Sequence, residues 1–187
     1  MSSAHPLAER LIERLQSQRN IRILDFATGI GRNAEVLRRA GFTVIALSDD
    51  AAASDLPLED ERERFGAVLS THGLLHGPAR SIASRLRSIS EHIEPGGWLF
   101  ATFGSTGDAR YGRGEQIDES TFAPNGGDER GVPHAYYDRK RLCALLEPLF
   151  ELESLEEHRV DDVAGKWAHA RRPLAGAAHW FAVARRR

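Results

Sequence analysis

The chain has 187 residues, enough for one domain with a buried core, and its 41% hydrophobic and 28% charged residues are typical of a globular protein. A formal net charge of −2 gives no broad basic surface, so a nucleic-acid partner is not expected. No apolar run approaches the roughly 20 residues of a membrane span, and the charged N-terminus lacks the apolar stretch of a signal peptide. With Cys143 as the only cysteine, neither an internal disulfide nor a cysteine-based zinc site is expected, and a cytoplasmic location fits.

The first part of the chain alternates between helical and strand-like patterns. Leucines at every fourth position from Leu7 to Leu15 predict an opening helix. The apolar runs 21–26, 42–48, 66–71 and 98–103 predict strands, and the segments 32–40 and 79–93 predict helices. Because strands that alternate with helices pair in parallel, this half predicts an α/β sheet covered on both faces.

The pattern changes after the last of these strands. Residues 105–137 are rich in glycine and charge and show no clear period, so we expect a long lid or substrate loop. Asp138 then begins a helix that carries four leucines. The segments 150–160 and 179–186 have no clear helix between them and predict an antiparallel hairpin at the sheet edge. We therefore expect one domain over residues 1–187.

The stretch ILDFATGIGRN, residues 23–33, joins a buried strand to a helix through a Gly-x-Gly turn. Such a turn lets a ligand approach the main chain, and the helix N-terminus favours an anion. A dinucleotide pyrophosphate and the methionine end of S-adenosylmethionine both suit that geometry. Asp25 favours the second ligand, since a carboxylate attracts an ammonium group and repels a diphosphate. Gly29 to Ala34 nevertheless matches G-x-G-x-x-A, and a tight turn without any ligand is the remaining alternative.

Three stretches resemble, in chain order, motifs of the class I S-adenosylmethionine-dependent methyltransferases. ILDFATGIGRNAEVLRRAGFTVIAL resembles their first motif, DLPLEDERERFGAVLST their fourth-strand region, and LRSISEHIEPGGWLFATF their approach to strand five. The stretch from GVPHAYYD to HWFAVARR resembles small, tellurite-resistance-type or uncharacterised members. The resemblance implies a Rossmann-like doubly wound sheet, mostly parallel with an antiparallel C-terminal strand. Only 17 residues separate Ser48 from Gly66, so strand three is expected to be short or missing.

The resemblance also implies which residues contact S-adenosylmethionine. These are Asp25, Ala27, Thr28, Gly29, Gly31, Asn33, Ser48, Asp49, Asp55, Leu56, Ser70, Thr71 and His72. Two positions depart from the family pattern. Alanine at position 27 replaces glycine, which is tolerable only if the backbone there avoids a positive φ angle. Ser48 replaces the ribose-binding acid, so Asp49 is the substitute candidate.

Two histidines follow the predicted strand 66–71, at the sheet edge where ligands bind in α/β proteins. His72 or His76 can act as the general base that deprotonates the acceptor. They can instead form half of a metal site with His134 and Asp138, or only pack and hydrogen-bond in the pocket wall. Gly73 and Gly77 disfavour a regular helix and weaken the metal geometry, so we expect no metal.

The loop 105–137 is expected to overhang the same edge and bind the acceptor. Candidate substrate-binding residues are Arg110, Tyr111, Arg113, His134 and Tyr137. Arginines of the loop can clamp an anionic acceptor through paired hydrogen bonds, and its tyrosines can exclude water. The alternative is a solvated lid whose arginines form salt bridges with Asp108, Glu115 and Asp118.

Taken together, the residues and the resemblance predict transfer of a methyl group from S-adenosylmethionine to an unidentified small-molecule acceptor, by a monomer or homodimer. Two alternatives remain open at this point. One is an NAD(P)-dependent Rossmann reductase, which Asp25 disfavours. The other is a non-catalytic S-adenosylmethionine-binding or partner-binding module, which Ser48 and the short third strand favour.

Overall fold

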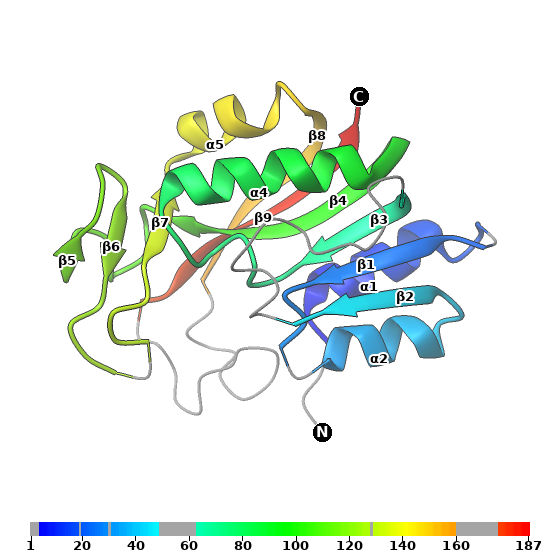
Figure 1. Cartoon of the computed structure of the whole chain (residues 1–187), viewed down its shortest axis with the longest axis horizontal. Helices are drawn as coiled ribbons and strands as arrows, with labels where there is room; N and C mark the ends of the chain where they lie inside the picture. The colour runs from blue at the N-terminus through cyan, green and yellow to red at the C-terminus, as the bar shows by residue number, and fades with distance from the viewer. Residues whose placement is uncertain (1–3, 19, 30, 49–62, 128, 160–175) are drawn as a thin grey trace.

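A computed structural model describes residues 4–18, 20–29, 31–48, 63–127, 129–159 and 176–187 of the chain. A twisted sheet forms the centre, and the described helices cover both of its faces (Figure 1). Helices α1 (Pro6–Leu15) and α2 (Arg32–Arg39) cover one face, and α4 (Ala79–His92) and α5 (Arg139–Leu146) cover the other. None of the described helices is long and apolar enough to cross a membrane.

The sheet is parallel in its first half and antiparallel at one edge. Strands β2 (Thr43–Leu47), β1 (Arg22–Phe26), β3 (Phe65–Ser70) and β4 (Ile93–Ser105) lie side by side in this order, all parallel. Strand β9 (Ala178–Arg186) runs antiparallel to β4, and β8 (Phe150–Arg159) runs antiparallel to β9. This confirms the predicted Rossmann-like sheet with its antiparallel C-terminal hairpin. The expected short or missing third strand falls mainly on residues 49–62, which lie outside the described residues.

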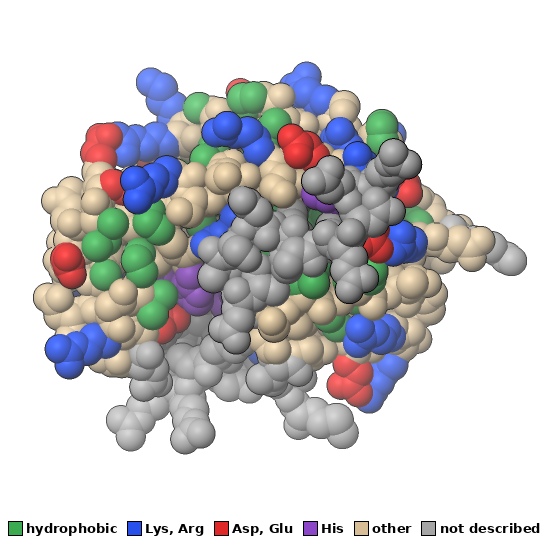
Figure 2. Space-filling view, viewed as in Figure 1, with side chains coloured by type: hydrophobic (Ala, Val, Ile, Leu, Met, Phe, Trp, Pro, Cys, Tyr) green, Lys and Arg blue, Asp and Glu red, His purple; other side chains and the backbone are tan. Residues whose placement is uncertain are grey.

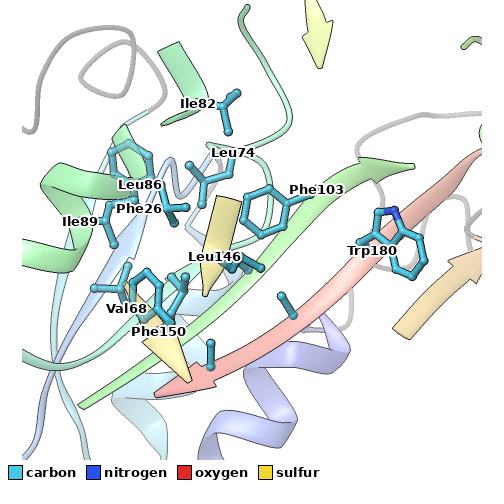
Figure 3. Packing of buried hydrophobic residues seen from close by; sticks show 14 of the residues in the cluster. Phe26, Val68, Leu74, Ile82, Leu86, Ile89, Phe103, Leu146, Phe150 and Trp180 are labelled. Carbon is cyan, nitrogen blue, oxygen red and sulfur yellow. The ribbon is translucent and has the colours of Figure 1, made fainter. Parts of the chain in front are cut away.

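Alternation along the strands divides the apolar side chains between two cores. Leu24 and Phe26 of β1 face the core under α4 and α5, whereas Ile23 faces the core under α1 and α2. Figure 3 shows the first core, in which Leu86 and Ile89 of α4 pack beside Phe26. Because both faces of β1 are buried, its carboxyl end is held in a fixed position and can present polar residues at the sheet edge.

The segment 105–137, expected to be a long lid or substrate loop, contains three short strands. These are β5 (Glu115–Gln116), β6 (Thr121–Ala123) and β7 (His134–Tyr137). Strand β4 continues past the end of β3, and β7 pairs in parallel with its last residues through Gly104 and Ser105. Strand β6 then pairs antiparallel with β7, and β5 with β6. Strands of two to four residues are too short to show a period in the sequence.

Glycine makes the pairing of β4 with β7 possible. A Cβ atom at Gly104 would lie 2.4 Å from the carbonyl oxygen of Ala135. On the other edge of β4, His179 of β9 is the residue opposite Gly104. Tyr136, Gly104 and His179 therefore form one row across three strands, at the carboxyl end of the sheet.

Candidate functional site

The turn after β1 uses backbone conformations that favour glycine. Gly29 and Gly31 have φ angles of 56° and 77°, both in the left-handed region. Ala27 also has a positive φ, at 58°. The expectation that alanine here avoids a positive φ is therefore wrong, and the protein accepts the steric cost of a Cβ in this conformation. The Thr28 N–H donates to the carbonyl of Leu47 at 2.8 Å and fixes the turn to the end of β2.

Asp25 is a fully buried carboxyl group at the base of this turn. Its Oδ2 accepts a 2.6 Å hydrogen bond from the Thr28 hydroxyl, whereas Oδ1 has no hydrogen-bond partner within the described residues. Burial raises the pKa of Asp25 to about 6, although Thr28 and the nearby Arg38 and Arg32 favour its charged form. A buried carboxylate with an unused oxygen can accept hydrogen bonds from a ligand cation.

The N-terminus of α2 faces the same turn. Gly31 is its N-cap residue and makes no side-chain capping bond, while the Asp25 carboxylate interacts with the backbone N–H of Ala34 in the first turn. A Cβ built on Gly31 meets no atom of the described residues within 4 Å, so on their side the space beside this residue is open. The first N–H groups and the positive end of the helix dipole favour an anion there. The site thus offers a place for a cation at Asp25 and a place for an anion beside it.

Asn33 connects three elements around the turn. Its Oδ1 accepts from the His5 backbone N–H at 2.9 Å, and its Nδ2 donates to the Thr71 hydroxyl at 3.2 Å. The Thr71 carbonyl in turn accepts from the Thr102 hydroxyl at 2.6 Å. Burial lowers the pKa of His5 to about 3, so its ring is neutral near pH 7. Asn33 therefore holds the start of α1 and the end of β3 together, which positions the edge of the site.

The remaining predicted cofactor contacts lie at the ends of β2 and β3 or outside the described residues. Ser48 is exposed at the end of β2, and Asp49, Asp55 and Leu56 are among the residues that the structure does not describe. The buried Ser70 hydroxyl has no hydrogen-bond partner in the described ranges. The His72 ring nitrogen Nδ1 lies 3.2 Å from the Thr71 hydroxyl.

A second polar group, the His76–Glu129–His134 cluster, lies beside β7. The Glu129 carboxylate lies 3.6 Å from Nε2 of His76 and 3.2 Å from Nε2 of His134. Arg110 Nη1 donates to the same carboxylate at 3.1 Å. Hydrogen bonds from the two histidines hold the pKa of Glu129 well below its usual range. Figure 2 shows histidine side chains in purple at the surface of this face, beside the hydrophobic side chains around β5 and β6.

Arg110 is held in place by a buried acid. Its Nε and Nη2 donate to the two oxygens of Asp108, at 2.9 and 2.8 Å. Asp108 also accepts from the backbone N–H of Ala178 in β9, at 2.9 Å. Burial opposes the charge on Asp108, but these donors keep its pKa below the ordinary value. The salt bridge predicted between the loop arginines and Asp108 is thus present, and it leaves Arg110 committed to two carboxylates.

The other predicted acceptor residues are not all in one place. The Tyr111 ring packs edge-on against Tyr136 at 5.7 Å, and Arg113 is exposed. Tyr137 is buried in the core under α4 and α5, on the opposite face from Tyr136. Asp138 caps α5 by accepting from the Arg141 N–H at 2.7 Å.

The sequence did not single out Glu129 as a member of the cluster. Glu129 lies in a charge-rich loop where no periodic pattern distinguishes it from its acidic neighbours. Strand alternation separates the two buried tyrosines, since Ala135 and Tyr137 share the face that packs on the core under α4 and α5 and Tyr136 lies on the other face. His179 was also missed; burial and the nearby Arg110 lower its pKa to about 4.

Comparison with known proteins places this geometry in a family. A family model described as a methyltransferase domain matches residues 3–157. No curated protein sequence matches the chain. Among solved structures, an S-adenosylmethionine-dependent methyltransferase from Methanosarcina mazei is 16% identical, with a TM-score of 0.70 and 98% of each chain covered.

Two further solved structures show the same fold. A Burkholderia thailandensis 1,6-didemethyltoxoflavin-N1-methyltransferase, with S-adenosylhomocysteine bound, is 17% identical, with a TM-score of 0.62 and coverage of 97% of this chain and 77% of that one. TehB from Haemophilus influenzae is 15% identical, with a TM-score of 0.60 and coverage of 100% of this chain and 64% of that one.

Proposed function

This chain belongs to the methyltransferase-domain family and uses S-adenosylmethionine as its methyl donor, and we propose that it methylates a small molecule held over the ends of β3 and β4. The observation that carries the proposal is the buried Asp25 with one unused carboxylate oxygen, next to an open glycine turn and the start of a helix whose N-cap residue is a glycine. These features match an amino acid that carries both an ammonium and a carboxylate group.

The residues of the turn fit the methionine end of the cofactor. Asp25 Oδ1 would accept from the ammonium group, and the N–H groups that begin α2 would bind the carboxylate. Gly31 leaves the room that the ligand needs. When bound, the cofactor supplies a methyl group on a positively charged sulfur, which is the hard part of the chemistry. The same Asp25 would repel the diphosphate of a dinucleotide, which argues against a reductase.

The protein's own contribution is to orient the acceptor and remove its proton. His72 follows the end of β3, and His76 and His134 form a bridge near β7, so acceptors of different size can meet an imidazole. Tyr136 and Tyr111 would form an aromatic wall that keeps water away. Arg110 already pairs with Asp108 and Glu129, which makes it a weaker clamp for an anionic acceptor than its sequence position predicts.

Ligand binding and turnover test the proposal separately. S-adenosylmethionine and S-adenosylhomocysteine should each raise the melting temperature, and NAD and NADP should not, since only a ligand of the folded state stabilises it. Formation of S-adenosylhomocysteine should then be measured with panels of phenols, amines and thiols. A thermal response to NAD or NADP alone would remove the proposed donor. Cofactor binding without turnover on any acceptor would support a non-catalytic module instead.

A further inference from the structure

The His76–Glu129–His134 cluster has the composition of a metal site. One possible ligand atom from each of the three residues lies within 4.8 Å of the others. Two imidazoles and one carboxylate are a common ligand set for first-row divalent ions such as Zn²⁺, Co²⁺ and Fe²⁺. Magnesium and calcium prefer sites made only of oxygen.

The hydrogen bonds of His134 leave its Nε2 available as a ligand. Nδ1 lies 2.7 Å from the carbonyl oxygen of Val132, so it carries a hydrogen and donates it. Nε2, the other ring nitrogen, faces the Glu129 carboxylate at 3.2 Å. An ion placed between them would be bound by this nitrogen and by a carboxylate oxygen. A backbone carbonyl that fixes the second ring nitrogen is also the usual arrangement behind a metal-bound histidine.

The backbone holds the two histidines together before any ion binds. His76 and His134 form an isolated antiparallel bridge, and the Gly77 N–H donates to the Pro133 carbonyl at 2.7 Å. Their rings are 4.8 Å apart and almost perpendicular. Glu129 is anchored by the Val132 N–H, which donates to its carbonyl at 3.0 Å. Bonds of about 2.0–2.2 Å to one ion require only a small inward shift of these side chains, and that of His76 is 39% exposed and able to move.

We propose that His76, Glu129 and His134 bind one divalent transition-metal ion, and that this ion holds an oxygen of the methyl acceptor. The role of the ion toward the acceptor rests on the proposed function, whereas metal binding by the three residues does not. Three protein ligands leave coordination positions open for an acceptor. The segment 71–77 connects the cluster to the cofactor turn, since a Cβ at Gly73 would lie 2.8 Å from the Cβ of Ala27. Arg110 reduces the attraction for a cation only partly, because Asp108 neutralises it. This departs from the sequence analysis, which expects no metal.

Cobalt(II) chloride is the probe for the test. Protein without an affinity tag is treated with a chelator, and Co²⁺ is added while visible absorption and melting temperature are followed. We expect one ion per chain and a higher melting temperature. Glu129→Gln and His134→Asn should each weaken Co²⁺ binding at least about 100-fold. His92→Asn is the matched control, because His92 lies at the far end of α4 and contacts Ser88, and it should bind as the wild type does.

The outcomes test the metal site and the proposed methyltransferase function separately. If wild-type protein binds no Co²⁺, or if Glu129→Gln binds as tightly as wild type, the metal site is refuted. His76→Asn, at a half-exposed position, keeps the test decisive if a buried variant fails to fold, and it should also lose the ion. S-adenosylhomocysteine affinity, measured on the same proteins, separates the two proposals. Variants that lose Co²⁺ binding and still bind S-adenosylhomocysteine support the metal site. Wild-type protein that binds S-adenosylhomocysteine and no Co²⁺ refutes the metal site and leaves the proposed methyltransferase function intact.

Discussion

The cofactor turn and the His76–Glu129–His134 cluster surround their carboxylates in opposite ways. Asp25 keeps one carboxylate oxygen without a partner in the described part of the protein, and burial raises its pKa to about 6. Glu129 instead faces two imidazoles and a guanidinium, and its pKa is lowered. The turn is therefore built to receive a positive charge from its ligand, whereas the cluster surrounds its carboxylate with nitrogen atoms of the protein's own side chains.

The largest effect is expected from Asp108→Ala. This substitution should lower the stability of the protein on the acceptor side and leave cofactor binding unchanged. The substitution leaves the Arg110 cation and the Ala178 N–H without their buried partner, at a cost of about 3 kcal/mol in the free energy of unfolding. In a chain of this size the melting temperature should fall by roughly 6–12 °C. Cofactor affinity of the folded protein should stay the same. Glu35→Ala, which removes an exposed pair with Arg39, should change stability by less than about 0.5 kcal/mol. A smaller loss at Asp108 than at Glu35 would contradict the buried role.

Asp25→Asn tests the cofactor turn. Because a hydrogen bond to a charged group contributes about 1.5–3 kcal/mol, S-adenosylhomocysteine affinity should fall roughly 10- to 100-fold in calorimetric titration. Stability at pH 7.5 should not fall, since an amide costs less to bury than a carboxylate. Unchanged affinity would show that the ammonium group binds elsewhere.

Cofactor affinity and the stability of the unliganded protein should change in opposite directions with pH. Asp25 must be ionised to bind the ammonium group, so affinity should weaken up to about tenfold per unit below pH 6. The unliganded folded state binds the proton more tightly than the unfolded chain. The stabilisation from Asp25 is therefore present at low pH and is lost as the pH rises through about 6. Titrations and melting curves from pH 5 to 8 on wild type and Asp25→Asn measure both slopes, and equal slopes in the two proteins would rule Asp25 out as the cause.

The smallest effect concerns the backbone of the cofactor turn. Ala27→Gly removes a Cβ from the left-handed region and should stabilise the protein by about 0.5–1 kcal/mol, or roughly 1–4 °C in melting temperature. Ala83→Gly, in the regular helix α4, is the matched control and should destabilise by about the same amount. A loss of stability at position 27 would mean that the contact of its Cβ with the 71–77 segment outweighs the strain.

The parts of this protein that the sequence alone determined are those made by neighbouring residues. Leu7, Leu11 and Leu15 predict α1, the Asp138 side chain caps α5 as expected, and residues 23–33 contain the strand, the glycines and the helix start of the cofactor turn. Helical period, strand length and glycine conformation act over a few residues, so a linear pattern records them.

Only the tertiary structure decided the acceptor side. Strand β7 is too short to predict, yet its pairing with Gly104 brings His134 to His76 and turns Tyr136 toward the site and Tyr137 into the core. Glu129 joins the cluster through the turn before β7, a contact that no local spacing encodes. The physical reason is that hydrogen bonding between β4 and β7, and not the conformational preference of any one segment, sets where these side chains meet.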